Sequence, residues 1–153
     1  MGCYIDDNFE DDMDIGREVR SMYSRGNNLI RKLGFLSFDV KRSLFMSYCY
    51  PLYGSALWSK FTKAKLYRLE VAYNNTMRKL AYVAPWQSAR RMFVTCQVKS
   101  FQENLRSIVY SLMNRVESSD NGVLKLMQGS DALVTSSIRD RWRRLLFVGE
   151  HVG

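Results

Sequence analysis

Histidine is almost absent from this chain, which has only His151 among its 153 residues. One histidine close to the end leaves no material for a histidine base, a catalytic triad or a histidine-based metal cluster. The chain also contains no glycine-rich phosphate loop. We therefore expect no catalytic residue, no metal ligand and no cofactor.

Cysteine is scarce as well. Cys3, Cys49 and Cys96 are odd in number, and their spacings match no metal motif. Free thiols in a reducing compartment are the simplest interpretation. The N-terminus is acidic and has no apolar stretch typical of a signal peptide. These features predict an intracellular protein, in the nucleus or the cytoplasm.

Long apolar runs are lacking too. The longest uncharged run extends from Ser43 to Ser59 and contains Pro51, Gly54 and several serines and tyrosines. A membrane-spanning helix needs about 20 mostly apolar residues. This run is short and polar for that purpose, so we expect no membrane-spanning helix and, in the leading interpretation, no membrane partner.

What the chain does have is an excess of positive charge. Lysine and arginine number 23 against 15 acidic residues, a formal net charge of +8. Residues 1–18 hold seven of the acids and one base, which leaves 22 bases and eight acids in residues 19–153. A basic body behind an acidic leader favours a partner rich in phosphate.

Apolar residues recur at helical spacing through most of the sequence. We predict an all-α fold, an irregular bundle of five to seven helices in one domain over residues 12–153. Residues 1–11 form a separate segment, the remnant of an upstream element, in which one short strand is an open option. The expected helices cover residues 12–33, 37–58 with a kink at Pro51, 63–83, 88–96, 100–121 and 137–147, with a short piece at 123–127.

Basic residues concentrate around the two central helices, and aromatic residues lie among them. Cations bind phosphates without sequence preference, and exposed rings stack on bases. For any single cation a solvated helix surface is the simpler interpretation, and Trp58 and Trp86 could equally close the ends of a bundle. The candidate nucleic-acid-binding residues are Lys41, Arg42, Lys60, Lys63, Lys65, Arg68, Asn74, Arg78, Lys79, Arg90 and Arg91.

The segment Tyr4-Ile5-Asp6-Asp7 has the form of the metal-binding hairpin of reverse transcriptases. In that hairpin, adjacent carboxylates hold the ions of phosphoryl transfer. The hairpin needs a strand on each side, and the acidic residues after Asp7 do not form one. We interpret the motif as a coincidence within an acidic leader.

Several short motifs follow one another in the central part of the chain: Asp39-Val40-Lys41, Leu44-Phe45, Ser47-Tyr48-Cys49, Pro51-Leu52-Tyr53-Gly54, Leu57-Trp58 and Val71-Ala72-Tyr73-Asn74-Asn75 with Met77-Arg78. In order and spacing they resemble the region beyond the catalytic palm of reverse transcriptases from non-LTR (LINE-type) retrotransposons. The resemblance covers nearly the whole chain.

The resemblance implies a helical thumb and C-terminal region that binds the backbone of RNA or an RNA–DNA hybrid duplex. It places Tyr4-Ile5-Asp6-Asp7 after the family's catalytic hairpin, so the palm carboxylates would belong to sequence upstream. The chain would then be no enzyme as it stands, and the palm domain of the parent polymerase would be a partner. The oligomeric state stays open.

Two other functions are compatible with the residues. The basic amphipathic segment Ser137–Phe147 could bind a protein groove or an acidic membrane surface, which would make the chain a helical adaptor. Alternatively, Asp6 and Asp7 could serve an active polymerase, a hypothesis that first requires polymerisation to be observed.

Overall fold

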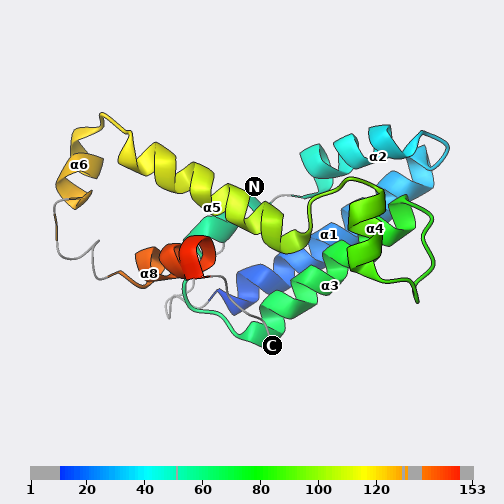
Figure 1. Cartoon of the computed structure of the whole chain (residues 1–153), viewed down its shortest axis with the longest axis horizontal. Helices are drawn as coiled ribbons and strands as arrows, with labels where there is room; N and C mark the ends of the chain where they lie inside the picture. The colour runs from blue at the N-terminus through cyan, green and yellow to red at the C-terminus, as the bar shows by residue number, and fades with distance from the viewer. Residues whose placement is uncertain (1–10, 51, 129, 131–135, 149–153) are drawn as a thin grey trace. The chain divides into compact units, whose positions relative to one another are not determined.

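The computed structural model describes residues 11–50, 52–128, 130 and 136–148. Within these ranges it contains seven α-helices and no strand, which confirms the predicted all-α class (Figure 1). The expected N-terminal strand and the Tyr4-Ile5-Asp6-Asp7 segment lie outside the described residues. The helices are α1 (Asp12–Leu33), α2 (Phe38–Leu44), α3 (Lys63–Leu80), α4 (Ala89–Thr95), α5 (Phe101–Glu117), α6 (Gly122–Gln128) and α8 (Ser137–Arg143), with π-helical η1 (Phe45–Cys49) and η3 (Arg144–Val148) and 3₁₀-helical η2 (Leu52–Leu57).

The chain divides into two compact units where we expected one domain over residues 12–153. Unit 1 consists of Met1–Leu52 and Lys60–Phe101, and unit 2 of Tyr53–Ser59 and Gln102–Gly153. The short segment 53–59 therefore belongs with residues that follow it much later in the sequence.

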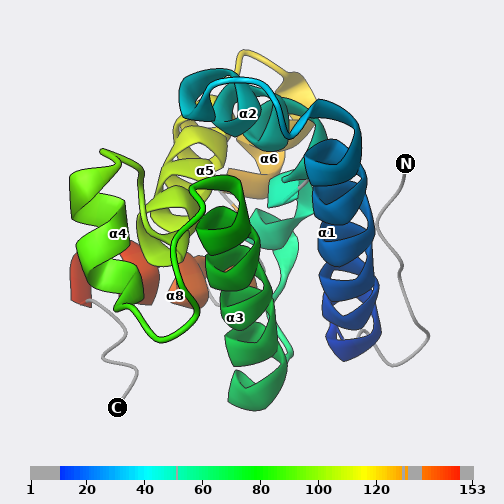
Figure 2. The same ribbon diagram turned by 90° about the vertical axis from the view of Figure 1, so that its right-hand side faces the viewer.

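In unit 1, α1 and α3 lie side by side and run in the same direction (Figures 1 and 2). At their starts the Thr62 backbone N–H donates to the Asp12 carboxylate at 2.8 Å. Near their ends the Lys79 ammonium donates to the Asn27 side-chain oxygen at 3.2 Å. Matched contacts at both ends fix the parallel register of the pair.

Helix α3 buries the apolar stripe that its sequence predicts. Leu66, Leu69, Tyr73 and Leu80 are all buried. The Tyr73 ring is the centre of an aromatic cluster, and its hydroxyl donates to the Lys99 carbonyl at 2.8 Å. The surrounding rings are those of Phe45, Tyr50, Phe93 and Phe101, with centroids 5.2 to 6.1 Å from that of Tyr73.

The segment after Ser37 corrects the prediction of one kinked helix. Helix α2 ends at Leu44, a π-helical turn follows, and η2 is a separate 3₁₀ helix. Lys41, Phe45 and Cys49 are buried in this segment, whereas Val40 and Tyr48 are exposed. A π turn has more residues than an α turn and so rotates the residues beyond it. A 3.6-residue period continued past Leu44 does not anticipate this change of helix type.

Helix α1 passes unbroken through Gly26-Asn27-Asn28, although glycine and asparagine favour turns. Gly26 is buried where α1 packs on α3, and a Cβ built there would lie 2.5 Å from Thr76 Cγ2. The glycine therefore permits a close approach of the two helices.

In unit 2, α8 is fixed to the segment 53–59 by side chains that donate to backbone carbonyls. The Arg141 guanidinium donates to Ser55 O at 2.9 Å and to Trp58 O at 2.6 Å, and Trp142 Nε1 donates to Ala56 O at 2.6 Å. Although it is charged, Arg141 is only 2 % exposed. Helix α8 thus supplies donors to carbonyls of η2 and of the residue that follows it.

Candidate nucleic-acid interface

The outward face of α3 brings together five of the candidate residues. It lies opposite the stripe that packs into unit 1, so helical geometry directs these side chains away from the core. Lys63, Arg68 and Lys79 are exposed, and Asn74 and Arg78 are half-buried. The Tyr67 ring on this face is 59 % exposed. Cations and a ring thus line a single helix surface, while the side-chain oxygen of Asn74 is buried beneath it.

Helix α1 extends this surface, because Tyr23 and Asn27 of α1 lie beside the outward face of α3. The Asn75 amide donates to the Tyr23 hydroxyl at 3.5 Å, and Lys79 donates to Asn27. Arg20 and Arg31 are exposed, seven residues before and four after Asn27, so they share its face of α1. These two arginines were not among the predicted residues. The pattern of charges at helical spacing along residues 20–31 could have identified them.

We call the exposed surface formed by Arg20 and Arg31 of α1 and Lys63, Arg68 and Lys79 of α3 the basic ridge. The sequence is free of acids at the end of the basic ridge where α1 and α3 finish, since residues 19–38 and 71–102 contain neither aspartate nor glutamate. The acids of unit 1 lie mainly at the opposite end, where α1 begins with Asp12 and Asp14. The potential along unit 1 therefore becomes more positive toward the ends of α1 and α3.

Two candidate arginines also make bonds within unit 1. Arg78 donates to the Asn75 side-chain oxygen at 3.1 Å and to the Gln87 carbonyl at 3.2 Å. Arg42 donates to the Gln97 carbonyl at 3.4 Å and lies 4.0 Å from Asp39. These contacts orient both guanidinium groups and leave part of each accessible, because both residues are half-buried.

Lys41 is the candidate that the structure removes from the surface. It is 2 % exposed, its ammonium donates to the Gly34 carbonyl at 3.4 Å, and it lies 4.1 Å from the centroid of the Tyr82 ring. A cation–π contact and a carbonyl therefore satisfy this charge inside unit 1. Its role here is structural.

The remaining candidates lie in other parts of unit 1. Lys60 is exposed beside the acidic start of α1, where its backbone N–H donates to the Asp11 carboxylate at 2.8 Å. Lys65 is half-buried in the first turn of α3. Arg90 and Arg91 are exposed on α4. The structure thus places these four apart from the outward face of α3.

A buried pair of acids distinguishes the inner face of α1. Asp14 forms an ion pair with Arg17 at 2.6 Å, and Arg17 also contacts Glu18 at 3.1 Å. Burial raises the pKa of the Glu18 carboxyl, with Arg17 acting in the opposite direction. Burial likewise raises the pKa of the Cys49 thiol. A buried thiol that holds its proton is a poor nucleophile.

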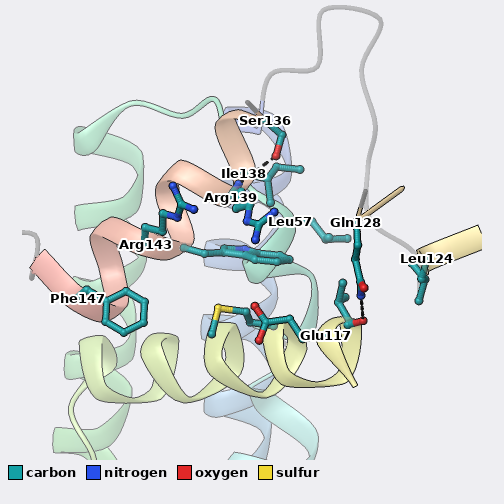
Figure 3. Close-up of a pocket in the computed structure, with 12 residues that line it drawn as sticks. Leu57, Glu117, Leu124, Gln128, Ser136, Ile138, Arg139, Arg143 and Phe147 are labelled. Carbon is teal, nitrogen blue, oxygen red and sulfur yellow. Dashed lines mark hydrogen bonds between the residues drawn. The ribbon is translucent and has the colours of Figure 1, made fainter. Parts of the chain in front are cut away.

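Unit 2 contains a cavity of about 530 Å³ between α5, α6 and α8 (Figure 3). Its lining is mainly apolar and includes Leu57, Ile138 and Phe147. Arg139 and Glu117 also contribute to the wall, with opposite charges. The lining contains no histidine or cysteine.

In the part of the chain that the structure describes, no cluster of three or more potential ligands is placed to hold a metal ion. No helix among the described residues is long and apolar enough to cross a membrane. The chain matches no protein-family model, no curated protein sequence and no solved structure. The candidate site therefore has to be judged on its own geometry and charge.

Proposed function

We propose that the chain is a non-catalytic nucleic-acid-binding part of a LINE-type reverse transcriptase, which binds RNA or an RNA–DNA hybrid duplex through the backbone. The observation that carries this proposal is the basic ridge, where two parallel helices present five exposed cations on one unit. Phosphate contacts position a duplex without reading its sequence, and they require cations more than base-reading side chains. The ordered motifs around Tyr73 and Asn74 supply the family resemblance.

The palm domain of such a polymerase is the second partner in this proposal. Met13, Val40 and Tyr48 are 60 %, 45 % and 72 % exposed on α1, α2 and η1. Exposed apolar side chains in neighbouring elements favour coverage by another folded part. Intracellular placement, in the nucleus or the cytoplasm, belongs to the same proposal.

The helical adaptor is less well supported. Its binding segment, Ser137–Phe147, would need a free apolar face. Trp142 and Leu145, two main apolar residues of that segment, are already buried. The third hypothesis depends on Asp6 and Asp7, which lie outside the described residues. We therefore favour nucleic-acid binding.

The test is the salt dependence of binding to a short RNA–DNA hybrid duplex. Replacing Arg20 and Arg68 together with glutamine should weaken binding and lower the log–log salt slope by about one unit per lost phosphate contact. The matched control is R106Q/R144Q, which removes the same charge from two exposed positions of unit 2. A salt-independent interaction, or equal losses in both double variants, would contradict the proposal.

A further inference from the structure

The end of unit 1 where α1 and α3 finish carries three exposed aromatic rings. Phe35, in the connection after α1, is 82 % exposed. Tyr82 and Trp86, in the connection after α3, are 73 % and 86 % exposed. Of the three tryptophans, Trp86 alone is exposed, since Trp58 and Trp142 are 3 % and 8 % exposed. Large rings left in water at one place suggest a binding surface.

Hydrogen bonds hold these two connections in place. The Tyr82 hydroxyl donates at 2.8 Å to the carbonyl of Gly34, the residue before Phe35. The Lys41 ammonium contacts the same carbonyl and also the Tyr82 ring. On the other side, Arg78 donates to the carbonyl of Gln87, the residue after Trp86. The rings are therefore attached to backbone that is fixed on both sides.

Tyr82 also has an unusual backbone conformation. Its φ is 53°, in the left-handed region that non-glycine residues seldom adopt. This conformation ends α3 and directs the chain away from the helix. The bond to Gly34 and the contact with Lys41 are two interactions that stabilise it. Strained backbone conformations of this kind cluster at functional sites, where they fix the position of a side chain.

The charge around these rings selects the kind of ligand. Arg31 and Lys32 in the last turn of α1 and Lys79 in the last turn of α3 are exposed. Residues 19–38 and 71–102, which supply all three rings, contain no acid. Exposed rings beside uncompensated cations match a ligand with flat faces and regular negative charge. Single-stranded nucleic acid has both properties.

We propose that Phe35 and Trp86 stack on unpaired nucleotides that extend from a duplex bound on the basic ridge. The phosphates of these nucleotides pair with Arg31 and Lys79. This inference rests on the proposed duplex binding and adds a second ligand, a single-stranded extension, to the same unit. Stacking is tolerant of sequence, so the site should accept different bases.

The experiment compares binding of the full chain to a blunt hybrid duplex and to the same duplex with a short oligouridylate extension. The extension should tighten binding by at least about tenfold for each stacked base, and should quench the tryptophan fluorescence. Trp86→Leu and Phe35→Leu should abolish this advantage while the affinity for blunt duplex stays unchanged. Val94→Ala, which alters an exposed residue of the same unit that cannot stack, should retain the advantage.

Three results would overturn the inference. Equal affinity of the native chain for the blunt and the extended duplex would exclude stacking on the extension, but would not contradict the proposed duplex binding. Self-association of the native chain that Trp86→Leu abolishes would assign the rings to a protein contact. Failure to bind either duplex would remove the inference and the proposed function together.

Discussion

Thr76 occupies the space that a side chain at position 26 would need. Its Cγ2 lies 2.5 Å from the ideal Cβ position of Gly26, and its hydroxyl donates to the Ala72 carbonyl at 2.8 Å. Gly26→Ala should therefore destabilise the protein by about 1–3 kcal/mol, although alanine favours an isolated helix by about 1 kcal/mol. Rotation of Thr76 away from the new methyl would break its buried hydrogen bond. Chemical denaturation measures the loss.

A second substitution tests the cause of that loss. Thr76→Ser removes Cγ2 but keeps the hydroxyl, and the next Thr76 atom lies 3.6 Å from the ideal Cβ position of residue 26. The loss of unfolding free energy in the G26A/T76S variant should therefore be smaller than the sum of the losses in the two single variants. If the two single losses simply add in the double variant, the cost of Gly26→Ala does not come from contact with Thr76.

Lys41→Met should lower stability without changing nucleic-acid affinity. The substitution keeps an apolar stem of similar length but removes the ammonium that contacts Gly34 O and the Tyr82 ring. The expected loss is about 1–2 kcal/mol. Lys32→Met, at an exposed position near the end of α1, should change stability by less than about 0.5 kcal/mol. A large loss of nucleic-acid affinity with unchanged stability would show that Lys41 takes part in binding.

Arg141→Met should destabilise unit 2. It removes a buried guanidinium that donates to the carbonyls of Ser55 and Trp58, and both acceptors lose a charged donor. The expected cost is about 2–4 kcal/mol. Faster amide hydrogen exchange in α8 would localise it, and Arg144→Met, at an exposed position, is the control. Equal effects of the two substitutions would contradict this role.

Glu18 should make stability depend on pH. Burial raises its pKa in the folded protein above its ordinary 4.5, so the unfolded chain loses this proton first as the pH rises. The Glu18 contribution therefore favours folding at low pH and diminishes from about pH 4.5 upward. Glu18→Gln should flatten this part of the profile in urea titrations at pH 4 and pH 7. Asp39→Asn, whose side chain is 83 % exposed, should leave it unchanged.

The sequence predicts those elements whose apolar residues repeat at one uniform period. The expected helix over residues 12–33 has the observed bounds of α1, and α3 and α5 fall within their expected ranges. Continuous stripes such as that of Leu66, Leu69 and Leu80 identify the buried face without further information. The all-α class follows from the same pattern.

Elements that depend on distant partners escape this kind of prediction. Lys41 and Arg141 are buried because Gly34, Tyr82, Ser55 and Trp58 offer acceptors or a ring, and sequence distance conceals these pairs. For the same reason the candidate cations could be grouped by sequence but not assigned to one surface. Arg20 and Arg31 join the basic ridge only because α1 runs parallel to α3.

The membership of residues 53–59 in unit 2 has a consequence for synthesis of the chain. The carbonyls of Ser55 and Ala56 receive their donors from Arg141 and Trp142, each 86 positions later. During translation this segment must therefore wait until Arg141 and Trp142 have left the ribosome. Unit 1 has all of its own residues by Phe101. Premature termination shortly after that point should yield a folded first unit in which residues 53–59 lack their partners from the second.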